Sequence, residues 1–221
     1  TDAKGASQLG NANKKYNTNV IISQGATVSG YAYAGGYGKK ATALSGDVYG
    51  TTYLALLGGT VSKDIYGGGT AGSVDDIFGT DAYDGTSNPN GFTASSNVYI
   101  LGGTARNVYG GGWQGNIGAQ KGHAGLTKDY PGATHVVIGK TGSDSFDGGN
   151  PAIQRNAYGG GEGGKVFGTA NITLNNGYIG YVHLSATEKQ NEKGEIVAAT
   201  TEDNLAERYE EKIIEDRKSV V

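Results

Sequence analysis

Side chains that could do chemistry are sparse in this sequence. It contains no cysteine, and its histidines are His123, His135 and His183. Without cysteine there are no disulfides, thiol nucleophiles or cysteine metal sites. The histidines lack a metal-binding spacing such as H-x-x-x-H, and lysine replaces the aspartate ligand in both near matches to the calcium repeat G-G-x-G-x-D, at Lys40 and Lys165. We therefore expect no metal site and no cofactor.

Charged side chains offer one route to catalysis. Polysaccharide lyases and glycoside hydrolases need paired carboxylates, or an Arg or Lys base, on a groove. The candidates are Asp75, Asp76, Asp81, Asp84 and Arg106, with Arg155 and Glu162 farther along the chain. No two of them recur in register with the repeats described below, so a non-enzymatic protein is favoured. A polysaccharide lyase or glycoside hydrolase acting on a groove of the fold stays open as the alternative.

Aromatic and amide side chains favour binding. Trp113 is the single tryptophan and follows a run of three glycines. Aromatic faces combined with a few placed amide and carboxylate groups are what carbohydrate recognition uses. We predict that a carbohydrate or host-surface ligand is bound by Trp113, Tyr83, Asp84, Asn88, Asn90, Tyr130 and Asp129. The alternative for Trp113 is that it packs beneath a loop.

These residues sit among close copies of one motif, the stretch Asn107–Gly112 with the sequence N-V-Y-G-G-G. In each copy a small or β-branched apolar residue precedes an aromatic residue, and a small residue follows. The copies centre on Tyr33, Tyr49, Tyr66, Phe78, Tyr109, Tyr158 and Phe167, and Ile117-Gly118 and Val182-His183-Leu184 are weaker copies without the aromatic residue. Copies this dense indicate a repeat protein.

The copies alternate between two kinds, which predicts the architecture. One kind leads into glycine pairs or triplets, at Tyr33, Tyr66, Tyr109 and Tyr158. The other leads into a run with an apolar residue at every second position, which is strand periodicity. The shortest spacings give a bare repeat of about 25 residues, so we predict an all-β coil of parallel strands, a β-solenoid of about four to five rungs. Its aromatic residues should form a column inside the coil or, as we favour, a partly exposed ladder on its wall.

Composition divides the chain into four segments. Residues 1–18 are polar and predict a flexible segment or cap, whereas residues 19–184 carry the solenoid repeats. Residues 185–200 are rich in charge and predict a linker. Residues 201–221 predict a C-terminal amphipathic helix with an apolar stripe formed by Leu205, Tyr209 and Ile213. We expect the helix to cover the open edge of the last rung, and a partner contact is the alternative.

Rungs longer than the bare repeat must loop out their extra residues, which are 80–94, 119–132 and 141–154. The first two insertions leave at the same point of consecutive rungs. They are therefore expected to form one lobe, and loops on a rigid scaffold are where binding usually resides.

Charge and hydropathy exclude several classes of protein. The net charge is -3 and basic residues are scattered, so nothing favours nucleic-acid binding. No run approaches the ~18 apolar residues of a membrane helix, and there is no apolar core of a signal peptide. The absence of methionine predicts a processed or excised piece. The surface rich in Asn, Gly, Thr and Tyr favours a location outside the cell.

The motif and its alternating strands, at Thr52–Gly69, Asn97–Trp113 and Asn156–Gly177, resemble the glycine-rich VYGGG repeats of adhesin-like surface proteins from anaerobic gut bacteria. The resemblance covers residues 19–184. It implies a right-handed parallel β-helix, secretion, display on the bacterial cell surface and a role in attachment. We therefore expect a non-enzymatic, adhesin-like structural repeat domain that binds carbohydrate or host-surface ligands, and the oligomeric state is left open.

Overall fold

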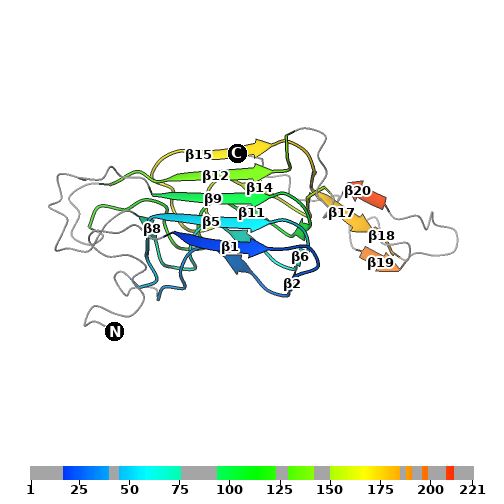
Figure 1. Ribbon diagram of the computed structural model, residues 1–221, viewed down its shortest axis with the longest axis horizontal. Coiled ribbons are helices and arrows are strands. Elements are labelled where there is room, and N and C mark those ends of the chain that lie inside the picture. Colours follow the sequence, from blue (N-terminus) through cyan, green and yellow to red (C-terminus); the bar gives the residue numbers. More distant parts are fainter. Residues whose placement is uncertain are drawn as a thin grey trace.

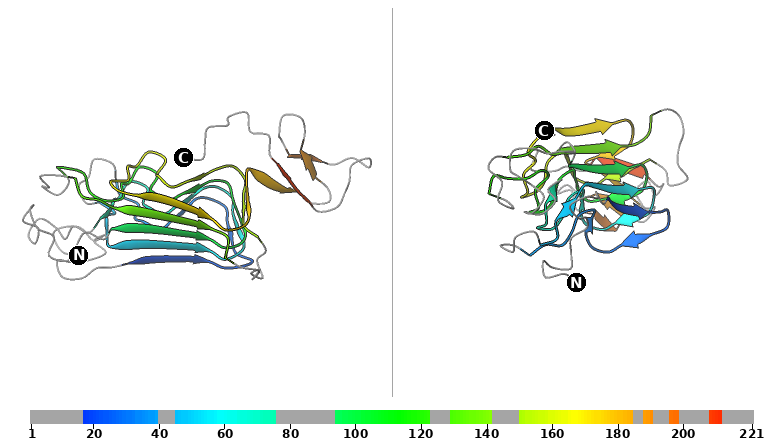
Figure 2. Two further views of the ribbon diagram at one scale, coloured as in Figure 1. Left: turned by 90° about the horizontal axis from the view of Figure 1, so that it is seen from above. Right: turned by 60° about the vertical axis from the view of Figure 1, so that its left-hand side comes forward.

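The computed structural model describes residues 17–39, 45–75, 94–122, 129–141, 150–184, 188–190, 196–198 and 208–211. Over these ranges the chain is all β, and most of its strands stack in parallel sheets around one interior (Figures 1 and 2). This is the predicted β-solenoid. No helix among the described residues is long and apolar enough to span a membrane.

The largest sheet, here called the long sheet, contains the strands that the alternating runs predict. Its five strands are parallel and lie side by side in chain order (Figure 1). They are β1 (Thr18–Ile22), β5 (Thr51–Leu56), β9 (Ser95–Ile100), β12 (Ala133–Ile138) and β15 (Ala170–Leu174). In β9 and β12 every second residue is buried, because alternate side chains point into the coil.

Three narrower sheets complete each turn of the coil. The second sheet contains β2 (Thr27–Val28), β6 (Thr60–Val61), β10 (Thr104–Ala105), β13 (Ala152–Ile153) and β16 (Tyr178–Ile179). The third, here called the tyrosine sheet, contains β3 (Ala32–Tyr33), β7 (Ile65–Tyr66), β11 (Val108–Tyr109) and β14 (Ala157–Tyr158). The fourth pairs β4 (Val48–Tyr49) with β8 (Val74–Asp75) and is extended by single bridges through Ile117 and Val166.

The interior is filled by columns of aliphatic side chains. Leu54 lies in register between Val20 and Val98, and Ile100 lies in register between Leu56 and Ile138. Leu54, Val98, Leu56, Ile100 and Ile138 are fully buried in one core that also contains side chains of the second and tyrosine sheets. Because each turn buries its apolar face only against its neighbours, this stacking holds the coil together. The alternating apolar residues of the predicted strands therefore face the interior.

A second column crosses the interior and consists of hydroxyl groups. The buried hydroxyls of Thr52, Ser96 and Thr134 each donate a hydrogen bond of 2.6 Å to a backbone carbonyl oxygen on the opposite wall. The acceptors are Gly67, Gly110 and Gly159, the residues that directly follow three of the tyrosines in the tyrosine sheet. These bonds tie the long sheet to the tyrosine sheet, and they satisfy carbonyl groups that would be costly to bury unpaired.

The length of a turn departs from the bare repeat. Thr52 lies beside Thr18 and Ser96 lies beside Thr52, so these turns take 34 and 44 residues. The second turn includes residues 80–94, which the sequence predicts as an insertion, and both turns are longer than the bare repeat of about 25 residues. The step from Ala152 to Tyr178 comes close to it.

One corner of the second kind is also placed differently. The sequence assigns it to Phe78, which lies outside the described residues. The position opposite Val48 and Tyr49 is taken by Val74 and Asp75. The weaker copy at Ile117 does stack on Val74, as its sequence predicts.

The C-terminal part contains strands where a linker and a helix were expected. β18 (Glu188–Gln190) pairs antiparallel with β19 (Ile196–Ala198) within the expected linker. β17 (Tyr181–Leu184) pairs antiparallel with β20 (Arg208–Glu211), which lies within the predicted helix of residues 201–221. The helix prediction is wrong for these four residues, because backbone pairing with β17 overrides their helical periodicity. The rest of that helix lies outside the described residues.

Candidate functional site

Aromatic and charged side chains on the outer side of the tyrosine sheet contact one another by ring stacking, hydrogen bonds and an ion pair. Tyr33, Tyr66, Tyr109 and Tyr158 form a continuous stack, here called the tyrosine ladder. Successive ring centroids lie 4.9, 4.9 and 4.8 Å apart, and the rings are within 13° of parallel. The prediction that these tyrosines lie in one line is confirmed. Tyr66 is only 1% exposed, whereas the other three are half-buried, so the ladder is a partly covered element of the wall.

The stacking limits what the ladder can bind. Each inner ring has another ring against both faces, so its edge and hydroxyl group are the parts left to meet a ligand. Carbohydrate stacking needs an open aromatic face. The ladder is therefore mainly a packing element.

The hydroxyls of Tyr33, Tyr66 and Tyr109 have raised pKa values. The hydroxyl of Tyr66 donates a hydrogen bond to a carboxylate oxygen of Glu162. Burial, followed by this hydrogen bond, raises the pKa of Tyr66 well above its ordinary value. Burial is also the main cause that raises the pKa of Tyr33 and of Tyr109. These three hydroxyls therefore stay protonated at neutral pH and can donate hydrogen bonds.

One margin of the ladder is held by a buried carboxylate. Asp64 accepts hydrogen bonds from Arg106 Nε at 2.8 Å, from Arg106 Nη2 at 2.6 Å and from Asn107 Nδ2 at 2.9 Å. Asn107 Oδ1 in turn accepts the backbone N–H of Asn156 at 3.1 Å. Asp64, Asn107 and Asn156 therefore form a ladder of carboxylate and amide side chains on successive turns. A two-point guanidinium–carboxylate pair is the strongest of the polar contacts in such a ladder.

Acidification should weaken the fold through Asp64. Burial alone would raise the pKa of Asp64, but the hydrogen bonds from Arg106 and Asn107 outweigh it and hold the pKa below the ordinary value of 3.8. A carboxyl whose folded-state pKa is lowered stabilises the fold above its unfolded pKa, and this contribution is lost as the pH falls through the lower value. We expect Asp64→Asn to be less stable than the wild type at pH 7, with the gap shrinking as the pH falls below 3.8.

Urea unfolding of both chains across that pH range measures the gap. Asp129→Asn, which alters an exposed carboxylate, is the control for general acid effects. A gap between wild type and Asp64→Asn that stays constant from neutral to strongly acidic pH would contradict the assignment.

The other margin of the ladder carries a row of outward residues, here called the corner row. Tyr37, Thr70, Trp113 and Glu162 each stand four positions after a ladder tyrosine. Backbone hydrogen bonds place them in register on successive turns: Thr70 N–H to Gly36 O at 3.0 Å, Trp113 N–H to Gly69 O at 3.1 Å, and Glu162 N–H to Gly112 O at 3.1 Å. The row therefore runs along the axis of the coil with a spacing of ~4.8 Å per turn.

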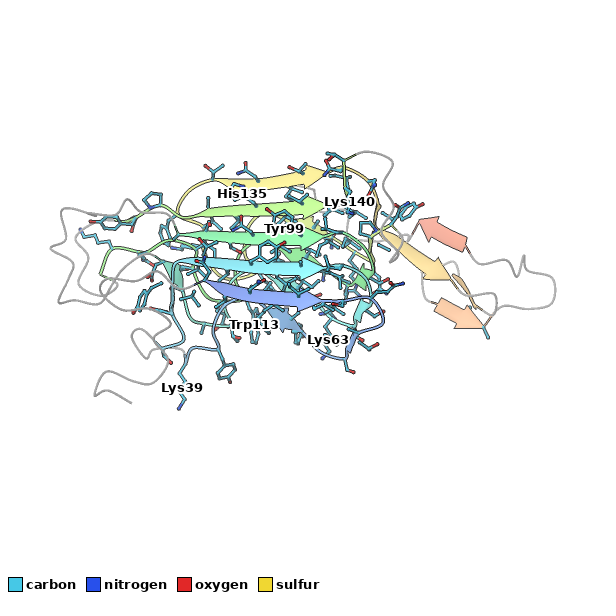
Figure 3. The ribbon with its side chains drawn as sticks, in the orientation of Figure 1. Lys39, Lys63, Tyr99, Trp113, His135 and Lys140 are labelled. Atoms are coloured by element: carbon cyan, nitrogen blue, oxygen red, sulfur yellow. The ribbon has the colours of Figure 1, made fainter. Side chains whose placement is uncertain are left out.

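Two members of the corner row expose aromatic rings. Trp113 is 41% exposed and Tyr37 is 78% exposed. In Figure 3, Trp113 is seen below β1, whereas Tyr99 and His135 lie over the long sheet. Because Tyr37 and Trp113 are two turns apart, their rings stand on the order of 10 Å from each other, with the hydroxyl of Thr70 on the turn between them.

The corner that carries Trp113 is held firmly by glycine. The carbonyl oxygen of Trp113 accepts the N–H of Gly163 at 2.6 Å. A Cβ on Gly112 would come within 2.5 Å of the carbonyl oxygen of Gly115 and 2.6 Å of that of Gly69. The triple glycine therefore permits the close backbone approach that fixes this corner, and the tryptophan projects from a rigid frame.

The predicted binding residues have different outcomes. Trp113 is 41% exposed on the wall, and the larger part of its surface is covered. Tyr130 is 6% exposed, and its backbone pairs with Ala119, so it packs at the base of an insertion. Asp129 accepts the N–H of Lys121 at 2.7 Å beside it. The remaining predicted residues lie outside the described ranges, and they are Tyr83, Asp84, Asn88 and Asn90.

Sequence reasoning missed Tyr37 as a partner of Trp113, although the signal was present. Both residues follow a ladder tyrosine by the same number of positions. Once the four tyrosines are aligned, that offset puts Tyr37, Thr70, Trp113 and Glu162 in one row.

Of the charged candidates for catalysis that are described, Asp75, Arg106 and Glu162 are buried or paired, whereas Arg155 is exposed. Asp75 is fully buried in β8. Arg106 is paired with Asp64, and Glu162 accepts from Tyr66. Asp76, Asp81 and Asp84 lie outside the described ranges. Within those ranges, no three His, Cys, Asp or Glu side chains are grouped as a metal site would require.

In comparisons with known proteins, no family model, no curated protein and no solved structure matches this chain.

Proposed function

We propose that this chain is a secreted or surface-displayed, adhesin-like repeat domain that binds carbohydrate or host-surface ligands at the corner row. The observation that carries this proposal is the pair of exposed aromatic residues, Trp113 and Tyr37, in register on a rigid wall. Sugar rings stack on such faces, and the hydroxyl of Thr70 supplies a hydrogen bond between them.

The spacing of the row favours an extended glycan that runs along the axis of the coil. A pyranose ring in a linear polysaccharide advances the chain by about the same distance as one turn of stacked strands, ~4.8 Å. A glycan aligned with the axis would therefore meet Tyr37 and Trp113 with alternate sugar rings. The coil that displays the row is proposed to be right-handed, because parallel crossover connections are right-handed in nearly all proteins. It is proposed to have four to five rungs.

A glycan-array screen of the purified chain, followed by calorimetric titration of the strongest hit, tests this function. Trp113→Ala is expected to weaken that affinity by about tenfold or more, since a central aromatic residue in an interface commonly contributes about 2 kcal/mol. Tyr37→Ala should weaken it in the same direction.

Tyr53→Ala is the matched control. Tyr53 is a half-buried tyrosine on the outer face of β5, where its ring lies 5.1 Å from that of Tyr99. We expect its affinity for the glycan to stay at the wild-type value. Failure of the chain to bind any glycan would overturn the binding function and leave a spacer. An equal loss in Tyr53→Ala would remove the site from the corner row.

A further inference from the structure

A row of basic side chains lies on the opposite margin of the tyrosine ladder. Lys63, Arg106 and Arg155 occupy successive turns, because Arg106 N–H bonds Lys63 O at 3.1 Å and Arg155 N–H bonds Arg106 O at 2.9 Å. Lys63 and Arg155 are exposed and Arg106 is half-buried. We call these three residues the basic row. Figure 3 shows Lys63 on the same lower side of the molecule as Trp113.

The positive charges of the basic row are only partly balanced by the described residues. Asp64 forms an ion pair with Arg106 at 2.6 Å. Lys63 instead lies over the ring of Tyr31, with Nζ 4.9 Å from its centroid. The whole chain carries a net charge of -3, so this concentration of positive charge is local to the basic row. Like charges on adjacent turns repel each other.

Arg106 and Arg155 differ in the residue that each meets in the row of Asp64, Asn107 and Asn156. Arg106 reaches back to Asp64 on the preceding turn, and its guanidinium grips that carboxylate at two points. On the turn that precedes Arg155, the position equivalent to Asp64 is occupied by Asn107, whose side chain is neutral. The same backbone arrangement therefore offers a carboxylate to one arginine and an uncharged amide to the next.

Tyr31 gives the row an aromatic end. It is 43% exposed, and its ring lies 6.1 Å from that of Tyr33 and 6.2 Å from that of Tyr66. The guanidinium carbon of Arg106 lies 5.9 Å from its centroid. The strip thus combines an aromatic platform with cations spaced by one turn of the coil.

We propose that the basic row is a second binding strip, which takes a linear glycan bearing carboxylates, a polyuronate, along the axis of the coil. One uronate carboxylate pairs with Arg155 as Asp64 pairs with Arg106, because guanidinium groups recognise carboxylates by two parallel hydrogen bonds. The carboxylate two sugars along the glycan faces Lys63, which lies two turns from Arg155. This strip lies on the other margin from Trp113, so it stands or falls independently of the corner row.

The test compares an oligogalacturonate, long enough to cover three turns, with its methyl ester, which has the same sugar backbone without the charges. The wild-type chain should bind the acid, with an affinity that falls as salt rises, and should not bind the ester measurably. Lys63→Gln/Arg155→Gln should lose affinity on the order of tenfold, because it removes two exposed charge pairs that each contribute a few-fold. Both residues are exposed, and an unchanged circular dichroism spectrum and melting temperature confirm that the double variant folds.

Lys121→Gln/Lys140→Gln removes the same charge elsewhere and should bind like the wild type. Trp113→Ala should also retain its affinity for the oligogalacturonate, which separates this strip from the corner row. Binding of the ester as tightly as the acid, an equal loss in the control double variant, absence of binding to the acid, or equally tight binding of single-stranded DNA as a generic polyanion would each overturn the proposal.

Discussion

Replacing Gly67 by alanine is expected to destabilise the fold by about 4 kcal/mol or more, which is at the extreme end for a single substitution. A Cβ at this position would overlap the carbonyl oxygen of Gly110 and the hydroxyl of Ser96, and it would approach Val98 Cγ2 at 2.7 Å. The carbonyl belongs to the next turn and the hydroxyl to the column that crosses the interior. Relief of the overlap would therefore require separation of two stacked turns.

Chemical denaturation monitored by circular dichroism measures this loss. Gly160→Ala is the matched control, since it changes another glycine of the repeated motif, and a Cβ there would meet no heavy atom within 4 Å. We expect the control to stay within about 0.5 kcal/mol of the wild type. Equal stability of Gly67→Ala and Gly160→Ala would mean that the turns are not stacked as closely as described.

Loss of the most deeply buried ring of the tyrosine ladder is the second large effect. Tyr66→Ala should cost about 3–5 kcal/mol, as truncation of a buried aromatic residue usually does. Its ring is 1% exposed and stacks against Tyr33 on one side and Tyr109 on the other. Truncation therefore opens a cavity between two rings that cannot close without a shift of both turns.

Tyr66→Phe separates the ring from the hydroxyl. It keeps the stack and removes only the hydrogen bond to Glu162, so its expected cost is about 0.5–1.5 kcal/mol. Tyr158→Ala, at the end of the ladder, should cost less than Tyr66→Ala, because one ring of the ladder contacts it. Urea unfolding of the three variants gives the order. A Tyr158→Ala variant as unstable as Tyr66→Ala would argue against packing as the main role of the ladder.

The parts of the fold that repeat in sequence could be predicted from the sequence. The tyrosine line emerges because Tyr66, Tyr109 and Tyr158 each precede a triple glycine, and glycine motifs mark the same turn in each rung. The aliphatic columns emerge because alternation fixes which side chains face inward.

The parts that depend on partners distant in sequence could not be predicted. The hydroxyls of Thr52 and Thr134 bond backbone carbonyl groups, which have no sequence signature. The lengths of individual turns could not be derived from the bare repeat, because the segments between the narrow strands vary and carry no periodicity. The strand at Arg208–Glu211 depends on pairing with β17, which local helical periodicity does not reveal.

One part of the candidate site could be predicted from the sequence, and the rest could not. Trp113 was found by its rarity and its place after three glycines, whereas Tyr37 and the basic row needed an alignment of turns whose lengths differ. Arg106 and Arg155 are far apart in sequence and become neighbours only when the turns stack.

We propose Trp113 as the ligand platform of the solenoid wall, and its fluorescence reports directly on this role. Trp113 is the single tryptophan of the chain, so selective excitation reports on this position alone. A saturating titration with the strongest glycan of the array should shift its emission to shorter wavelength and reduce its quenching by acrylamide, because a stacked sugar would cover the exposed 41% of its surface. If calorimetry shows that the glycan is bound while the emission and the quenching of Trp113 stay unchanged, Trp113 is not the ligand platform.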